Sequence, residues 1–168
     1  AHRLTLTVKQ TQQDTASADS TGLRFTTPSV FRMPVTVRVG TAEGDVTFKG
    51  HIDRREQTFA IDGVQSAPTM VIFDDGNTIL KQLTYDQPTA QLAEQLRRDS
   101  NLWNRAWVIR ELGKRTGDST AARALAAAAA HADYYLTRVA AADEIAAFPA
   151  AVSIPALSAA VHDTSALV

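Results

Sequence analysis

The first half of the chain alternates apolar and polar residues in short runs, with polar turns between them. The alternation is clear at residues 4–8 and 35–39 and recurs at 46–52 and 59–61. Because successive side chains of a strand point to opposite faces, each run predicts a half-buried β-strand. About six such strands at short, regular spacing predict a β-sandwich. The side chains expected in its core are Leu4, Leu6, Val8, Val35, Val37, Val39, Phe48 and Ile61.

Two features stand out within this first half. Residues 11–22 are polar and rich in Asp, Ser and Thr, which predicts a mobile loop with no assigned role. Gly50 shares a strand face with Phe48 and Ile52. A glycine inside a strand is typical of a bulge or of a close approach to the backbone, and we expect one of these at Gly50.

A tight turn is expected where the β half of the chain ends. Asp75 and Gly76 lie between two apolar runs, 70–73 and 79–83. Glycine accepts a positive φ angle, so an Asp-Gly pair in this setting predicts a hairpin with a strand on each side.

After Pro88 the apolar residues follow a helical period. Pro88 suits a first helical turn, and Leu92 and Leu96 then lie four residues apart on one face. Ser100 is the expected N-cap of a second helix, whose apolar side includes Ile109. The other members of that side are Leu102, Ala106 and Leu112, and Trp103 and Trp107 form a second pair beside it.

Three more helices are expected in the rest of the chain. An alanine-rich run at 121–132 predicts a helix capped by Asp118 or Ser119, because alanine has the highest helix propensity. Asp133 is the expected cap of a helix over 134–148. A last helix is expected to open at 154–157 and to end near residue 163.

Short helices in close succession predict antiparallel pairs of an α-solenoid. The final segment, IPALSAAVHDTSALV, resembles part of a HEAT repeat. We therefore predict a sandwich domain over residues 1–86 and a helical HEAT-like domain over 87–168, truncated at its C-terminal end. An apolar stripe would then lack its next repeat, so we expect this end to fray or to form a homodimer. The stripe consists of Ile154, Leu157 and Val161.

Composition narrows the classes of function. The 168 residues carry a net charge of −1, which argues against nucleic acid or an anionic membrane as a partner. There is no cysteine, so disulfides and thiolate sites are excluded, and no apolar run approaches the length of a membrane span. The first residues lack a signal-peptide core and already have a strand pattern, so we expect a piece of a longer protein. The compartment stays open.

The sequence contains no recognisable catalytic constellation. The histidines at positions 2, 51, 131 and 162 are scattered, and no His-Glu-x-x-His motif occurs. Asp74, Asp75 and Asn77 lack the EF-hand spacing, so a turn is favoured over calcium. Two short basic pairs, Arg54-Arg55 and Arg97-Arg98, are interpreted as solvated faces. The two tryptophans favour an inter-helix core, or packing against the β unit, over a ligand platform.

Several segments carry a family resemblance. They are LTLTVKQTQ, FRMPVTVRV and, most specifically, VIFDDGNTILKQLTYDQPTAQLAEQLRRDSNLWNRAWVIREL. Together they resemble the C-terminal half of gluzincin aminopeptidases of the aminopeptidase N family. In that family a β-sandwich ends in an Asp-containing turn, followed by an "iLK.L" segment and by helices carrying "QL" and "R..A...L".

The resemblance implies a noncatalytic part of such an enzyme. It would comprise an immunoglobulin-like β-sandwich and the start of the helical domain that closes over the catalytic domain and limits peptide access. The zinc helix and the Gly-x-Met-x-Asn segment of the family lie upstream and do not occur here. No catalytic, cofactor-binding or metal-binding residue is therefore assigned in this chain. Zinc would belong to the absent catalytic domain, which would be this chain's partner within one polypeptide, and peptides would be substrates of the parent.

Two alternatives remain open from the sequence. A transcription-initiation subunit shares this architecture without the zinc site, so the chain could be a scaffold or protein-interaction module from a zinc-less relative. An independent enzyme with an unrecognised site is the weaker alternative, because neither a nucleophile–base pair nor a metal constellation is found.

Overall fold

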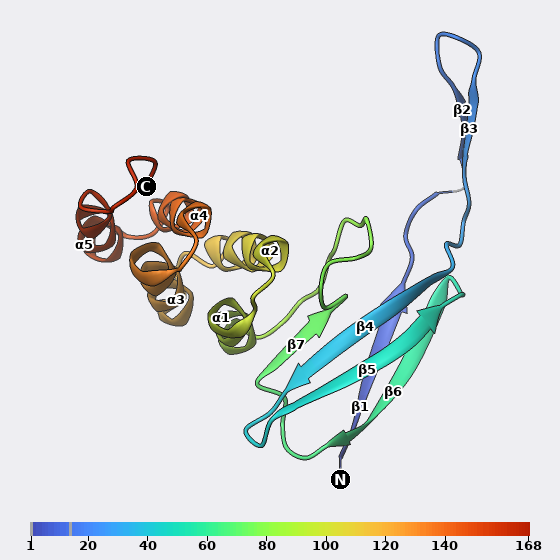
Figure 1. The fold of residues 1–168 in the computed structure, drawn as a ribbon, viewed down its shortest axis with the longest axis horizontal. Coiled ribbons are helices and arrows are strands. Elements are labelled where there is room, and N and C mark those ends of the chain that lie inside the picture. Colours follow the sequence, from blue (N-terminus) through green and yellow to red (C-terminus); the bar gives the residue numbers. More distant parts are fainter. Residues whose placement is uncertain (1, 14) are drawn as a thin grey trace. The chain divides into compact units, whose positions relative to one another are not determined.

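The computed structural model describes residues 2–13 and 15–168, which form seven strands followed by five helices (Figure 1). The chain divides into two compact units. The first contains Ala1–Pro68 and Phe73–Asp75, and the second contains Thr69–Ile72 and Gly76–Val168. The predicted order, antiparallel strands followed by helices, is confirmed.

The strands form three small antiparallel sheets. Their bounds are β1 (His2–Lys9), β2 (Thr15–Ala18), β3 (Arg24–Thr27), β4 (Met33–Gly40), β5 (Asp45–Ile52), β6 (Glu56–Val64) and β7 (Met70–Phe73). β1 pairs with β6, and β2 pairs with β3. The third sheet has the order β5-β4-β7, in which β4 and β5 are a hairpin that pairs Val37 with Phe48.

The predicted alternation sets which faces of these strands are buried. Val35, Val37 and Val39 of β4 are at most 2% exposed, and Ile61 of β6 is as deeply buried. On the other expected strands the inward residues are only half-buried: Leu4, Leu6, Val8 and Phe48. The faces are as predicted, but β1 contributes less to the core than its sequence pattern suggests.

Gly50 lies where a side chain would meet an aromatic pair. A Cβ atom at this position would lie 2.7 Å from Cε1 of Phe48 and 3.1 Å from Cε1 of Phe59. The two phenylalanine rings, from β5 and β6, have centroids 5.3 Å apart in a tilted arrangement. The expected close approach at Gly50 is therefore made by these rings, which occupy the space a Cβ would need.

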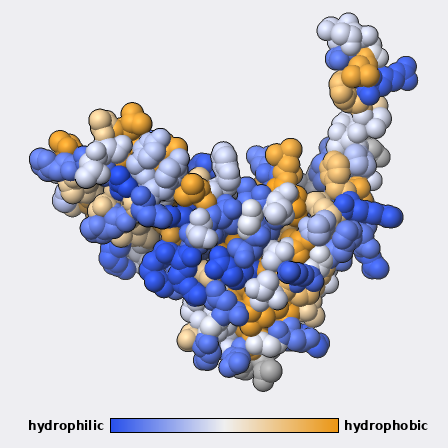
Figure 2. All heavy atoms as spheres, viewed as in Figure 1, coloured by the Kyte–Doolittle hydropathy of each residue, from blue (hydrophilic) through white to orange (hydrophobic). Residues whose placement is uncertain are grey.

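Residues 11–22 are not a continuous loop, contrary to the sequence prediction. Thr15–Ala18 is the strand β2, which pairs with β3 from Thr15↔Thr27 to Ala18↔Arg24. All four residues of β2 are exposed, so the strand buries no apolar face and leaves no alternation in the sequence. Leu23 and Phe25 are also more than half exposed, and hydrophobic surface is visible on this hairpin in Figure 2.

The prediction of a second strand after the Asp75–Gly76 turn is also wrong. β7 is the first strand, but residues 77–88 contain neither strand nor helix. Asp74, Gly76 and Asn77 all have positive φ angles, of 56°, 97° and 53°. This backbone does not match a two-residue hairpin turn. Leu80 of the expected second strand is fully exposed, so the apolar run at 79–83 buries no continuous face.

The helices are α1 (Thr89–Arg98), α2 (Leu102–Gly113), α3 (Ser119–His131), α4 (Tyr135–Ile145) and α5 (Ala150–Ala160). Asp118 caps α3 by accepting hydrogen bonds from the backbone N–H groups of Thr120 and Ala121, at 2.7 and 3.3 Å. The Thr89 hydroxyl also donates to Asp118, and this hydrogen bond, with those from the backbone, holds the pKa of that carboxyl below its usual value. Asp118 was one of the two expected caps, and the structure selects it over Ser119.

Three helices differ from the prediction in where they begin or end. Asn101, not Ser100, caps α2, because its side chain accepts from the N–H groups of Trp103 and Asn104, each at 3.1 Å. α4 begins after Tyr134 and ends at Ile145, inside the expected 134–148. α5 begins at Ala150 rather than at 154, with Pro149 as its N-cap and Pro155 within it.

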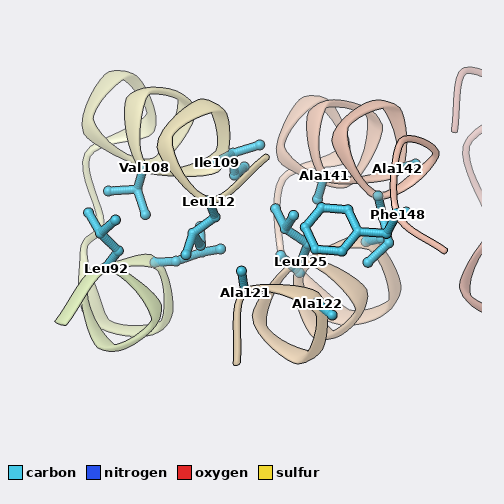
Figure 3. Packing of buried hydrophobic residues seen from close by; sticks show 14 residues of the cluster. Leu92, Val108, Ile109, Leu112, Ala121, Ala122, Leu125, Ala141, Ala142 and Phe148 are labelled. Atoms are coloured by element: carbon cyan, nitrogen blue, oxygen red, sulfur yellow. The ribbon is translucent and has the colours of Figure 1, made fainter. Parts of the chain in front are cut away.

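The helical unit has one hydrophobic core. Residues of α1 to α4 form it, and α5 packs against it. α1 packs on α2 and α3, α2 on α4, and α3 on both α4 and α5. Figure 3 shows Leu92 of α1 pointing towards Val108 of α2, and Phe148 lying beside Leu125 and Ala141. Leu92 and Leu96, the expected apolar pair of α1, both belong to this cluster. None of the helices in the described residues is long and apolar enough to cross a membrane.

Candidate functional site

A groove opens between α1 and α3 of the helical unit, which lie side by side (Figure 1). Its volume is about 540 Å³. Six of its thirteen lining residues are alanine, and six of the others have polar side chains. The lining residues are Ala90, Ala93, Glu94, Leu96, Arg97, Arg105, Thr120, Arg123, Ala124, Ala127, Ala128, His131 and Ala132. We call this feature the α1–α3 groove.

On the α1 side, the carboxylate of Glu94 lies near two arginines, Arg97 and Arg98. Glu94 accepts hydrogen bonds from Arg97 at 2.9 Å from Nε and 2.7 Å from Nη2. Nη1 of Arg98 lies 3.7 Å from the same carboxylate. The hydrogen bond and the negative charge of Glu94 raise the pKa of Arg97 above its usual value. Both Nε and Nη2 of Arg97 are therefore paired with Glu94.

On the α3 side, Arg123 extends from an exposed position. Its Nη2 donates to the hydroxyl of Thr120 at 3.2 Å, a neutral partner one turn earlier on the same helix. His131, at the end of α3, is exposed on the same groove. Arg123 thus makes its hydrogen bond to a neutral hydroxyl group.

Arg105 reaches the groove from α2. It is only 9% exposed, and its Nη1 donates to Asp133 at 2.7 Å. The Arg105 guanidinium, by its hydrogen bond and its charge, lowers the pKa of the Asp133 carboxyl. The buried Nε of Arg105 has no hydrogen-bond acceptor within the described part of the chain.

The three histidines with described side chains do not come together as metal ligands. His51 is exposed on β5, and His131 and His162 are exposed in the helical unit, while the side chain of His2 lies outside the described residues. Among the residues that the structure describes, no three His, Asp or Glu side chains are arranged to hold a metal ion.

Polar side chains of the Asp74–Asn77 turn form hydrogen bonds with other residues of the chain. Asp75 accepts a hydrogen bond from Nη2 of Arg38 at 3.2 Å, and Asn77 accepts one from Nζ of Lys81 at 2.8 Å. Asp74 is completely buried. The segment forms a turn, as predicted.

The two tryptophans differ in burial. Trp103 is 74% exposed, whereas Trp107 packs partly against the helical core and donates from Nε1 to the carbonyl of Leu83 at 3.4 Å. The expectation of an inter-helix core is confirmed for Trp107 and wrong for Trp103.

The groove itself was missed by the sequence reasoning. Arg97 was interpreted as part of a solvated basic pair, yet it lines the groove together with Arg123 of a different helix. The one trace in the sequence is the recurrence of alanine three or four residues apart beside these arginines, at 90, 93, 124, 127 and 128. That pattern equally suits close helix packing.

Comparisons with known proteins agree with this architecture. Residues 89–168 match the family of HEAT repeats, which corresponds to the five helices. The crystal structure of Legionella pneumophila aminopeptidase A in complex with aspartic acid is similar in fold, with a TM-score of 0.53 and 12% sequence identity. The match covers 81% of this chain and 18% of the aminopeptidase chain, so this chain spans about a fifth of that protein's length. No curated protein matches the sequence.

These matches define a class of architecture: a small antiparallel β unit followed by HEAT-like helices, an arrangement similar to part of an aminopeptidase. Because the identity is low, the likeness concerns the fold.

Proposed function

We propose that this chain is a noncatalytic accessory part of a zinc aminopeptidase of the aminopeptidase N type. In this proposal the chain packs against the catalytic domain of the same polypeptide and limits the access of peptides to it. The chain alone has no peptidase activity, and zinc belongs to the catalytic domain.

One observation carries this proposal. The fold match covers 81% of the chain, which is more than either unit contains, so it extends over parts of both the β unit and the helices. A match to the helices alone would fit any HEAT-like solenoid. The combination of a β unit and a helical array in the same order is more specific, and it agrees with the family resemblance of the segment around residues 70–112.

The test of this proposal compares the chain with its parent. The purified 168-residue chain is expected to give no turnover of aminoacyl-p-nitroanilides and to contain no stoichiometric zinc by mass spectrometry. The complete polypeptide is expected to turn these substrates over, and a chelator should abolish that activity. Chelator-sensitive turnover by the chain alone would contradict the proposal.

The alternative is a scaffold or protein-interaction module from a zinc-less relative, which the same fold would serve. The reading frame upstream of Ala1 separates the two. A His-Glu-x-x-His motif with a following glutamate supports the aminopeptidase, and an upstream domain without it supports the scaffold.

A further inference from the structure

We propose that the open edge of β1 binds an extended polypeptide segment of a partner protein as an additional antiparallel strand. The segment would carry apolar side chains at alternate positions and an acidic residue at each end. Main-chain hydrogen bonds would supply affinity, and the alternating side chains would supply specificity. This goes beyond the accessory role proposed above, because it assigns a binding edge to residues of this chain and can be tested on the chain itself.

The direction of the backbone groups of β1 is the first argument. The N–H of Gln10 donates to the carbonyl of Arg55 at 2.8 Å, and the same register continues along β1 and β6. Antiparallel ladders alternate hydrogen-bonded and non-hydrogen-bonded pairs, so every second residue of β1 directs its N–H and C=O away from β6. No other described strand pairs with β1. The residues whose backbone groups are thus open to a partner are Thr5, Thr7 and Lys9.

The second argument is the partial burial of the apolar face of β1. Phe59 and Ile61 of β6 are 8% and 1% exposed. The residues directly opposite them on β1, Leu6 and Leu4, are only half-buried. Burial therefore falls from β6 to β1, the strand at the edge. A further strand beside β1, with apolar side chains on this face, would remove more of the two leucines from water.

The middle of β1 lacks the features that usually protect an exposed edge. Proteins block such edges with proline, a bulge or a charged side chain. The register shift of β1 lies before Leu4, at the start of the strand. Its charged residues, Arg3 and Lys9, lie near the two ends. Thr5 and Thr7 between them are exposed and favour a strand. The central part of the edge can therefore accept a partner strand.

Charge at the two ends of the edge selects the occupant. Arg3 pairs with Asp62 across to β6 at 2.7 Å. Lys9 pairs likewise with Glu56 at 3.7 Å. An acidic residue of an added strand would lie on the other side of each basic side chain, where opposite charges across a sheet are favourable. A second copy of β1 fits less well, because pairing whole strands about Leu6 would place Arg3 opposite Lys9.

Fluorescence anisotropy of a labelled peptide titrated with the 168-residue chain measures this binding. The probe is Glu-Val-Thr-Val-Thr-Val-Glu, which places valine on the inner face and glutamate at both ends of the added strand. It should bind saturably. The same composition in the order Glu-Thr-Val-Val-Val-Thr-Glu loses the alternation and should bind at least about tenfold more weakly. Lysine in place of both glutamates should weaken binding about threefold to tenfold.

Methylation of the peptide backbone tests whether the main chains pair. In an antiparallel addition opposite Thr5 and Thr7, the threonine N–H groups of the probe face β1 and its valine N–H groups face away. Methyl groups on the threonine nitrogens should weaken binding at least about tenfold, because the donors to β1 are lost. Methyl groups on the valine nitrogens should change the affinity by less than about twofold, because no hydrogen bond to β1 is lost.

A proline variant locates the site on the chain. Thr5→Pro removes an N–H that points to the open edge and no hydrogen bond to β6, so the variant should fold and lose at least about tenfold in affinity. Ala60→Pro is the matched control. Ala60 is exposed and lies directly opposite Thr5, and its N–H points to the other edge of the same two strands. This variant should bind the probe as the wild type does, and amide NMR spectra verify that both variants are folded.

Several results would overturn the proposal. They are the absence of saturable binding, equal binding of the reordered peptide, and tighter binding of the lysine peptide. Equal affinities of the two methylated peptides, or equal affinities of Thr5→Pro and Ala60→Pro, would overturn it as well. If Thr5→Pro did not fold, the methylated peptides would still decide, because they leave the protein unaltered. None of these results depends on whether the parent is an aminopeptidase.

Discussion

The guanidinium of Arg138 holds the carboxylate of Asp163 through two hydrogen bonds, from Nε at 2.7 Å and from Nη2 at 2.9 Å. Both side chains are about nine-tenths buried. The remaining Nη1 of Arg138 donates to the carbonyl of Ala132 at 2.8 Å. One side chain of α4 therefore connects the end of α3 to the turn that follows α5, across segments far apart in sequence.

This pair predicts a dependence of stability on pH. The hydrogen bonds from Arg138, followed by that from the backbone of Ser165, hold the pKa of Asp163 below its usual value. A depressed folded-state pKa stabilises the protein above the unfolded pKa, and the stabilisation is lost as pH falls through the folded value. Asp163→Asn should thus destabilise the helical unit at neutral pH, and its difference from wild type should shrink below about pH 4.

Urea unfolding followed by helical circular dichroism across a pH series would measure this effect. Asp143→Asn is the control, because Asp143 is an exposed carboxylate on α4. The prediction fails if the two variants show the same pH profile.

Gly50 predicts a packing effect in the first unit. Gly50→Ala would bring a methyl group against the rings of Phe48 and Phe59, and overpacking of this kind costs about 1–3 kcal/mol. In a Phe48→Ala background the cost should largely disappear, because the nearest ring atoms are gone. Thermal unfolding of the four variants of this cycle measures the coupling. Lys49→Ala, exposed on the same strand, should change stability by no more than about 0.5 kcal/mol.

Two leucines of the second unit predict opposite results for the same substitution. Leu112 is completely buried in the helical core, so Leu112→Ala should lower the free energy of unfolding by about 2–5 kcal/mol. Leu80 is fully exposed, so Leu80→Ala should change it by no more than about 0.5 kcal/mol. Equal effects in urea unfolding would show that the apolar run at 79–83 is buried, as the sequence pattern first suggested.

The sequence predicts a helix or strand well where its buried residues recur at one regular spacing or where its composition favours one structure. Val35, Val37 and Val39 alternate because one face of β4 is buried, and the alanine run of α3 has few alternatives to a helix. The sequence does not predict β2, because all of its residues are exposed and it therefore has no alternating apolar pattern. At α2, Ser100 and Asn101 are both good caps by residue type, and only the backbone geometry selects Asn101.

The α1–α3 groove could not be predicted for a different reason. Its arginines and alanines come from helices that are not consecutive, and each helix alone shows only an ordinary exposed face. Arg97 and Arg123 are 26 positions apart by their residue numbers, and their shared surface exists only after α1 and α3 pack together. Sequence spacing within one helix carries no information about such a pairing.

The last helix predicts a gradient of local stability. α5 buries only Ser153 and Ala160, whereas α2 buries six residues, including Val108, Ile109 and Leu112. Local opening is easiest where few contacts are buried, so amides of α5 should exchange with solvent faster than those of α2. Hydrogen exchange followed by mass spectrometry measures this directly. Equal protection of the two helices would contradict the prediction.

The exposed apolar residues of the same region predict self-association. Ile154 is 61% exposed and Val161 is 80% exposed, while Leu157 is partly buried against the core. Because burial of such a stripe against a second copy removes apolar surface from water, we expect a concentration-dependent dimer of the isolated chain. Sedimentation velocity at several concentrations should show it. The double variant Ile154→Ser/Val161→Ser should remain monomeric, whereas Leu80→Ser, which removes a fully exposed leucine elsewhere, should dimerise like the wild type. A monomer at every concentration, or a dimer that survives the double variant, would show that this stripe is not the contact.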